Sequence, residues 1–342
     1  MKREFQATKN GLALIITLLL TGVSALAQDT DCPGTSPAIP DHSEVYAVAD
    51  DGLTLLHWDL WLPATTPAPV VLVIHVGGYK LGIRGPGSIA ADLAQHGFIA
   101  AAIDYRLDEF DPTNPVTANS LAYADNVGAQ YTQISDVKKA ILAARDPASI
   151  VIPHHPPSFL IGKTTGKVGG VGGSAGGSHA FYCAITGMPD RDRLDCAALL
   201  SGAYQFDDLR SLKTTNTGPV CRVKVDFNSN VSVYCGLPGP VDTSKPLPRV
   251  LTTGSPLYPL TQMSQSDAQS IPPLFLIATD NDPITPYQID DLKSALDQLK
   301  VRNYFETVIT DSCCHAFQYW NKMVDGAEVN ETVSRWLWTN LK

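Results

Sequence analysis

The chain has 342 residues, of which 44% are hydrophobic, and it carries a formal net charge of -9. This composition is typical of a globular protein with a sizeable core, built as one large α/β domain or as two smaller ones. The acidic balance argues against a nucleic-acid partner, because phosphates need a stripe of Lys and Arg side chains.

The first 27 residues have the three parts of a secretory signal peptide. Three basic residues precede an apolar run from Leu12 to Leu20, and small residues follow up to Ala27. The run is too short to span a membrane, and no second one follows it. We therefore expect residues 1–27 to be removed and residues 28–342 to be a secreted or periplasmic protein without a stable membrane anchor.

Short apolar runs alternate with amphipathic segments along the rest of the chain. Continuous apolar runs are typical of strands buried on both faces, and their alternation with helices predicts an α/β fold with a mostly parallel sheet covered on both faces. The runs predict strands at 53–63, 70–75, 98–105, up to Ser174, 196–202, 273–279 and 303–309. Helical spacing predicts helices at 88–97, 134–145, from Ser174 to about Gly187, 287–299 and 327–341.

Two polar stretches rich in Pro and Gly, near 108–132 and 205–252, fall outside this alternation. They follow strand ends, where ligand-facing loops belong, so we expect them to be insertions that contact the substrate. Cys221 and Cys235 flank a segment that predicts a hairpin closed by a disulfide. The seven cysteines are an odd number and form no C-x-x-C pair, so at least one lacks an intrachain partner and we expect no metal site.

Residues 169–180, GGVGGSAGGSHA, fit two motifs at once. One is G-x-G-x-x-A, which places a dinucleotide on a helix N-terminus, and the other is G-x-S-x-G, which presents a nucleophilic serine. A dinucleotide site needs an acid at the end of the next strand, but Asp190, Asp192 and Asp195 all precede that strand. The sequence therefore favours Ser174 as a nucleophile.

A nucleophilic serine of this kind requires an acid and then a histidine further along the chain, each on a loop after a strand. His315 is the only histidine beyond His179, and it follows an apolar strand. Asp282 comes just after another strand, in a loop stiffened by prolines, and Asp280 is the second choice. We predict Ser174, Asp282 and His315 as a catalytic triad.

Attack by the serine on a carbonyl also requires backbone N–H groups that stabilise the oxyanion. Gly77 and Gly78 follow the strand that ends at His75 and can bring bare backbone close to a substrate. Ala175 follows the serine at the start of its helix. We predict the N–H groups of Gly77, Gly78 and Ala175 as the oxyanion hole.

These motifs resemble those of α/β-hydrolase serine esterases, in the branch that includes hormone-sensitive-lipase-like enzymes and bacterial feruloyl and acetyl-xylan esterases. The resemblance runs from about Val45 to the C-terminus and rests on HVGGY, DYRL, GGSAGG, SPLY, DPITP and CHAF. It implies an α/β-hydrolase fold with about eight strands in a single domain. Val76, Tyr79 and Cys314 depart from the usual pattern, and a bridge from Cys313 or Cys314 to another cysteine could pin the histidine loop.

The sequence thus predicts a secreted carboxylic-ester hydrolase that forms an acyl-enzyme and needs no cofactor or metal. The resemblance suggests short-chain, acetyl or feruloyl esters, either small molecules or groups linked to a polysaccharide. Two alternatives stay open. One is a serine peptidase of the prolyl-oligopeptidase type, although no repeats for a propeller domain are present, and the other is a catalytically inactive hydrolase-fold binding module.

Overall fold

The computed structural model describes residues 38–84, 87–107, 128–214, 225–284, 286–310 and 312–342. The predicted signal peptide, most of the first predicted insertion and Cys221 lie outside these residues. In the described part of the chain, no helix combines the length and apolar character that crossing a membrane requires.

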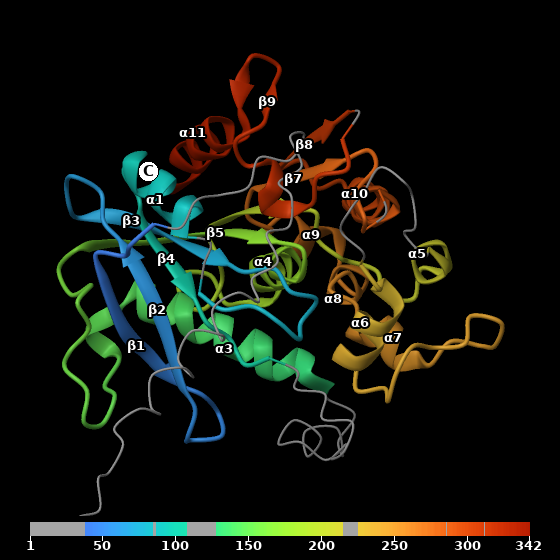
Figure 1. Cartoon of the computed structure of the whole chain (residues 1–342), viewed down its shortest axis with the longest axis horizontal. Coiled ribbons are helices and arrows are strands. Elements are labelled where there is room, and N and C mark those ends of the chain that lie inside the picture. The colour runs from blue at the N-terminus through green and yellow to red at the C-terminus, as the bar shows by residue number, and fades with distance from the viewer. Residues whose placement is uncertain (1–37, 85–86, 108–127, 215–224, 285, 311) are drawn as a thin grey trace, which may run out of the picture.

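Within the described residues, the main sheet has eight strands in the order β1-β2-β4-β3-β5-β6-β7-β8 (Figure 1). β1 pairs antiparallel with β2, β2 pairs antiparallel with β4, and all other neighbours are parallel. The strands are β1 His42–Val48, β2 Leu55–Trp61, β3 Ala68–Ile74, β4 Ile99–Ile103, β5 Thr164–Gly173, β6 Cys196–Leu200, β7 Leu274–Thr279 and β8 Tyr304–Ile309. A mostly parallel sheet of eight strands is what the sequence predicts.

Long helices cover both faces of this sheet, as Figure 1 shows. Alternate residues of β3 belong to opposite core clusters: Val71 and Val73 pack in one with α1 and α11, while Val70 and Leu72 pack in the other. This division follows from the two-residue period of a strand. The helices are α1 Gly87–Gln95 and α11 Val329–Leu341 on one face, and α3 Gly128–Arg145, α4 Ala175–Thr186 and α10 Tyr287–Gln298 on the other.

Shorter elements fill the connections, most of them after β6. They are α5 Leu209–Lys213, α6 Phe227–Tyr234, α7 Arg249–Gly254, α8 Tyr258–Thr261, α9 Gln265–Ala268, the 3-10 turns Pro147–Ser149 and Ala316–Tyr319, and the pair β9 Met323–Val324 and β10 Ala327–Glu328. Residues of α5, α6 and α7 form a third hydrophobic cluster with Tyr79 and Ala175. The second predicted insertion therefore packs against the two segments that carry the predicted oxyanion hole.

The hairpin predicted between Cys221 and Cys235 is wrong, because residues 227–234 form α6. The side chain of Asp226 accepts a hydrogen bond from the N–H of Ser229 and caps the helix. In the helix, Phe227, Val231 and Tyr234 follow helical spacing and pack together in the third hydrophobic cluster. The helix predicted to begin at residue 134 starts at Gly128, so the end of the first predicted insertion belongs to α3.

Candidate active site

Ser174 lies in the tight turn between β5 and α4, with φ 55° and ψ -119°. A Cβ on Gly172 would lie 2.1 Å from the carbonyl oxygen of Gly176, and a Cβ on Gly176 would lie 2.1 Å from that of Ile74. Both positions therefore require glycine, because any side chain would collide with backbone. The N–H of Ser174 donates to the carbonyl of Leu200 at 2.8 Å, which ties the turn to β6.

Asp282 and His315 meet on loops that follow β7 and β8. His315 Nδ1 donates to Asp282 Oδ1 at 2.8 Å, which leaves Nε2 of the neutral ring as an acceptor. Asp280 instead accepts a hydrogen bond from the N–H of Ser312. The acid in contact with the histidine is therefore Asp282, the first choice of the sequence analysis.

Ser201 connects this acid to the histidine loop. Its hydroxyl donates to Asp282 Oδ2 at 2.5 Å and accepts a hydrogen bond from the N–H of Ala316 at 3.1 Å. The hydroxyls of Ser201 and Tyr319 are 3.0 Å apart, and the N–H of Ile284 donates to Asp282 Oδ1 at 2.7 Å. The sequence analysis missed Ser201, whose only signal is that it directly follows a buried strand.

The loop after β3 carries Gly77, Gly78 and Tyr79, which all have positive φ angles of 137°, 59° and 71°. The carbonyl of Gly77 accepts hydrogen bonds from the N–H groups of Lys80 and Leu81. A Cβ on Gly77 would lie 1.8 Å from the carbonyl oxygen of Leu81. The turn is therefore too tight for a side chain, and it brings the backbone of both glycines to the surface of a cavity.

A buried hydrogen-bond chain supports this loop from behind. Gln133 Nε2 donates to the carbonyl of Tyr79 at 2.9 Å, and His179 Nε2 donates to Gln133 Oε1 at the same distance. The Tyr79 hydroxyl lies 2.9 Å from Ser178 Oγ. Burial lowers the pKa of His179 to about 3, so its ring stays neutral at physiological pH. The sequence analysis missed Gln133 and His179, because no chain pattern distinguishes them from ordinary helix residues.

The loop, the serine and the histidine surround one cavity of about 560 Å³. Its described wall contains five of the six predicted site residues: Gly77, Gly78, Ser174, Ala175 and His315. Asp282 lies behind His315. His315 Nε2 is buried and makes no hydrogen bond with any described residue. The hydrogen bond that would join it to Ser174 Oγ is therefore not formed in this structure. Such contacts often tighten only when substrate is bound.

The rest of the cavity wall is mostly apolar. It comes from the loop after β3, from Ala203, from residues of α6 and from Ile284, which follows Asp282. The polar side chains among them are Lys80, Asp226 and Asn230. An apolar pocket with a few polar groups is typical of a site for a small organic ligand.

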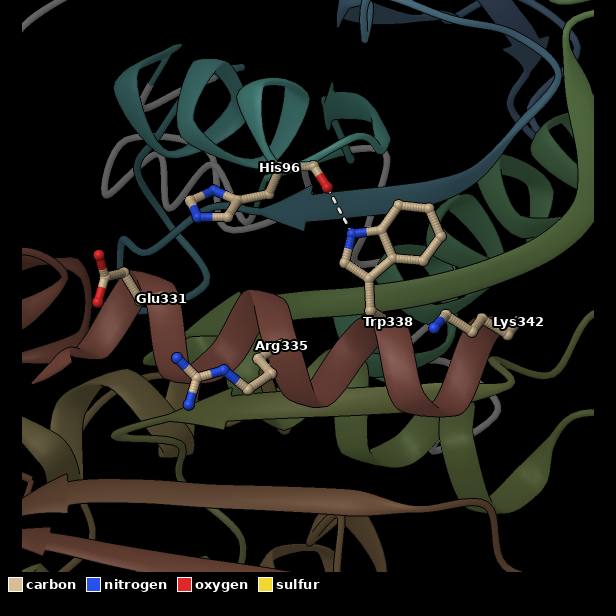
Figure 2. Close-up of a pocket in the computed structure, with 5 residues that line it drawn as sticks. All are labelled: His96, Glu331, Arg335, Trp338 and Lys342. Atoms are coloured by element: carbon tan, nitrogen blue, oxygen red, sulfur yellow. Dashed lines mark hydrogen bonds between the residues drawn. The ribbon is translucent and has the colours of Figure 1, made fainter.

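A second hollow of about 640 Å³ lies against α11 (Figure 2). Figure 2 shows Glu331, Arg335, Trp338 and Lys342 following one another along this helix, with His96 from the end of α1 beside them. Trp338 Nε1 donates to the carbonyl of His96, so the indole N–H serves packing between the helices. None of these five lining residues is a Ser, Thr or Cys nucleophile, and the candidate active site is the cavity at Ser174.

Among the described residues, no group of three or more His, Cys, Asp or Glu side chains is arranged to hold a metal ion. Cys183 and Cys196 are buried thiols in α4 and β6, and burial raises the pKa of Cys183 to about 12. A thiol with so high a pKa is a poor nucleophile at neutral pH, because the thiolate is the reactive form.

No protein-family model matches this sequence, and no significant match appears among curated protein sequences. Solved structures match over most of the chain. Esterase 2 of Thermogutta terrifontis is 16% identical, covers 88% of this chain and 94% of its own, and gives a TM-score of 0.56. A fungal esterase from Rhizomucor miehei is 17% identical, covers 89% of this chain and 86% of its own, and gives a TM-score of 0.62.

The chain has the α/β-hydrolase fold. A third structure with this similarity is an acetyl ester-xyloside bifunctional hydrolase from Caldicellulosiruptor lactoaceticus, 16% identical, which covers 89% of this chain and 98% of its own with a TM-score of 0.56. The fold class expected from the sequence is therefore confirmed, and the structural neighbours include esterases, as the resemblance implies. In the α/β-hydrolase fold, the turn after β5 is where a nucleophile is presented at the edge of the sheet.

Proposed function

We propose that the chain is a serine carboxylic-ester hydrolase that acts through an acyl-enzyme. Ser174 is the nucleophile, His315 is the general base, and Asp282 orients the imidazole and stabilises its charged form. The main support is that Ser174 and His315 line one cavity, while Asp282 accepts a hydrogen bond from His315 Nδ1. The same cavity is lined by Gly77, Gly78 and Ala175.

The reaction begins when Ser174 Oγ attacks the ester carbonyl carbon and its proton passes to His315 Nε2. The carbonyl oxygen becomes an oxyanion and accepts hydrogen bonds from the N–H groups of Gly77, Gly78 and Ala175. The tetrahedral intermediate collapses, the bond to the alcohol oxygen breaks, and that oxygen takes the proton from His315. Water then attacks the acyl-enzyme by the same route and releases the acid.

Two features support a preorganised oxyanion hole. The backbone of the loop is bent so tightly that Gly77 cannot carry a side chain, and Gln133 donates a hydrogen bond to the carbonyl of Tyr79 from behind the loop. Donors that are already in place need no reorganisation when charge develops on the substrate. Losing one such donor typically lowers the rate about 100- to 1000-fold.

The substrate is expected to be a short-chain, acetyl or feruloyl ester. An apolar cavity of about 560 Å³ suits a small acyl or alcohol group. The structurally similar protein from Caldicellulosiruptor lactoaceticus is named as an acetyl ester-xyloside bifunctional hydrolase, which fits an acetyl ester as substrate. We place the protein outside the cytosol, as the predicted signal peptide indicates. The predicted bridge from Cys313 or Cys314 to another cysteine would fit an oxidising compartment.

The test uses residues 28–342, a fluorophosphonate probe and four substrates: p-nitrophenyl acetate, p-nitrophenyl palmitate, methyl ferulate and acetylated xylan. We expect the native protein to be labelled and to hydrolyse at least one ester, and Ser174→Ala to lose both properties while it unfolds at a similar temperature. Ser149→Ala, a change of an exposed serine outside the cavity, should keep both. Absence of labelling in the native protein would refute the proposal, and labelling of Ser174→Ala would show that another residue is the nucleophile.

A further inference from the structure

One face of helix α6 packs into the third hydrophobic cluster, and an amide side chain lies on the same face. Phe227, Val231 and Tyr234 are 4%, 1% and 1% exposed and follow helical spacing toward the third hydrophobic cluster. Asn230 stands three residues after Phe227 and so lies on the same face. It lines the cavity at Ser174 together with Phe227 and Val231. An amide at this position is unexpected in a helix face that otherwise provides packing.

The amide of Asn230 covers Gly78 directly. A Cβ on Gly78 would lie 2.5 Å from Asn230 Nδ2 and 2.9 Å from Asn230 Cγ. A side chain at position 78 would therefore require this amide to move. The contact places a hydrogen-bonding group beside the loop that carries the proposed oxyanion donors.

The helix is held firmly against this loop. Lys80 Nζ donates to the backbone carbonyl and to Oγ of Ser229, both at 3.3 Å. The rings of Tyr79 and Tyr234 stack with centroids 4.0 Å apart. Asn230 lies between these two contacts along the helix, so its position on the cavity wall is fixed by both.

The Asn230 side chain makes no hydrogen bond with any residue that the structure describes. Asn228 on the same helix is different, since its amide accepts from the N–H of Val241 at 2.8 Å and donates to the carbonyl of Val241 at 3.0 Å. Asn230 shares the cavity wall with the apolar Val225, Phe227, Val231 and Ile284 and with the polar Lys80 and Asp226. The amide therefore faces the space that a substrate would fill.

We propose that Asn230 determines specificity by hydrogen bonding an oxygen that the substrate carries close to its scissile ester. This inference rests on the proposed function, because it assumes that an ester binds at Ser174. Nδ2 donates to an ether, carbonyl or hydroxyl oxygen, and Oδ1 accepts from a hydroxyl. An alkyl group in the same place would leave the amide unpaired, and an unpaired polar group in a site discriminates against such a substrate.

Matched substrates test the inference. In p-nitrophenyl methoxyacetate an ether oxygen replaces one CH2 group of the acyl chain of p-nitrophenyl butyrate. In 2-hydroxyethyl butyrate a hydroxyl replaces the terminal CH3 group of the alcohol part of propyl butyrate. For each pair the ratio of kcat/KM is measured in the native protein and in Asn230→Leu, so that intrinsic ester reactivity cancels. We expect the variant to lower the preference for the oxygen-bearing member about tenfold in at least one pair, the effect of one hydrogen bond.

Two further variants protect the result against folding defects. Asn230→Asp keeps the shape and the acceptors but loses the donors, so the preference for the methoxy ester should fall while the protein folds. Asn228→Ala removes a structural amide outside the cavity wall, and it should lower stability without changing either ratio. Fluorophosphonate labelling of Ser174 is measured in every protein.

The outcomes separate the two proposals. Labelling and ester hydrolysis with both ratios changed by less than threefold would overturn the role of Asn230 and leave the proposed function standing. An equal loss on all four esters would also overturn it, because it would indicate a uniform effect on the hole or on folding. Absence of labelling in the native protein would overturn the proposed function itself.

Discussion

Ser174 and His315 both line the cavity, and different kinds of contact hold them. Backbone contacts hold the serine turn, where glycines at 172 and 176 leave no space for a single added carbon. Side-chain hydrogen bonds hold the histidine, through Asp282 and Ser201. The first kind of support fails completely when it is altered, because atoms cannot overlap, whereas the second kind can lose one hydrogen bond and keep the rest.

The largest effect is expected at the serine turn. Gly176→Ala would place a Cβ 2.1 Å from the carbonyl oxygen of Ile74, so β3 and α4 must move apart. We expect esterase activity to fall at least 1000-fold and the free energy of unfolding to fall by about 3 kcal/mol. Hydrolysis of p-nitrophenyl acetate and denaturant unfolding measure the two quantities.

Gly239→Ala is the matched control, because an added Cβ at Gly239 meets nothing within 4 Å. Its activity should stay within twofold of the native value and its stability within about 0.5 kcal/mol. Near-native activity in Gly176→Ala would show that the turn tolerates movement and would contradict the distinction between backbone contacts and side-chain hydrogen bonds.

An intermediate effect is expected on the histidine side. Ser201→Ala removes one of three hydrogen bonds to Asp282 and leaves the N–H of Ala316 without its acceptor. We expect kcat to fall about tenfold with little change in KM, and stability to fall by about 1–2 kcal/mol. Steady-state kinetics together with thermal unfolding distinguish this result from a general loss of structure.

The exposed Ser149, which donates to the carbonyl of Asp146, offers a control for serine removal. Ser149→Ala should change kcat less than twofold. If Ser201→Ala were as damaging as Gly176→Ala, the side-chain network would be as intolerant as the backbone turn.

The smallest effect concerns pH and the support of the loop after β3. Burial lowers the pKa of His179 to about 3 from an ordinary value of 6.5. Between these values the unfolded chain binds a proton that the folded protein excludes. The contribution of His179 to the free energy of unfolding is therefore fully present above pH 6.5 and declines as pH falls toward 3. From pH 7.5 to pH 5.5, His179 should cost about 1 kcal/mol.

His179→Gln, which keeps a donor near Gln133, should lose about 1 kcal/mol less than the native protein over this interval. Denaturant unfolding at the two pH values measures the difference. Equal losses in both proteins would mean that His179 takes up a proton in the folded state and would contradict its buried, neutral role. The glycine contacts at Ser174 involve no titratable group and add no pH dependence.

The positions of most strands along the chain and the fold class could be predicted because buried runs such as 70–75 and 273–279 differ clearly from the amphipathic segments between them. β1 was not predicted, because its sequence HSEVYAV mixes polar and apolar residues and so lacks the continuous apolar run of a central strand. Residues 227–234 were predicted as part of a hairpin because Cys221 and Cys235 flank the segment. Their packing against Tyr79, a contact far away in the chain, favours a helix instead.

The candidate site divides in the same way. Ser174, Asp282 and His315 follow strands in a fixed order, so chain position alone indicated them. Ser201 and Gln133 act through contacts with residues 81 and 54 positions away, and no local pattern predicts such contacts. The sequence therefore predicts groups at strand ends and misses the side chains that hold them.

The third hydrophobic cluster has one more consequence. It is separate from the two clusters that sandwich the sheet, and most of its residues come from the segments after β6. Substitutions in α5, α6 and α7 can therefore reshape the cavity without loosening the sheet that carries Ser174, Asp282 and His315. The choice of substrate can thereby be altered separately from the proposed chemistry.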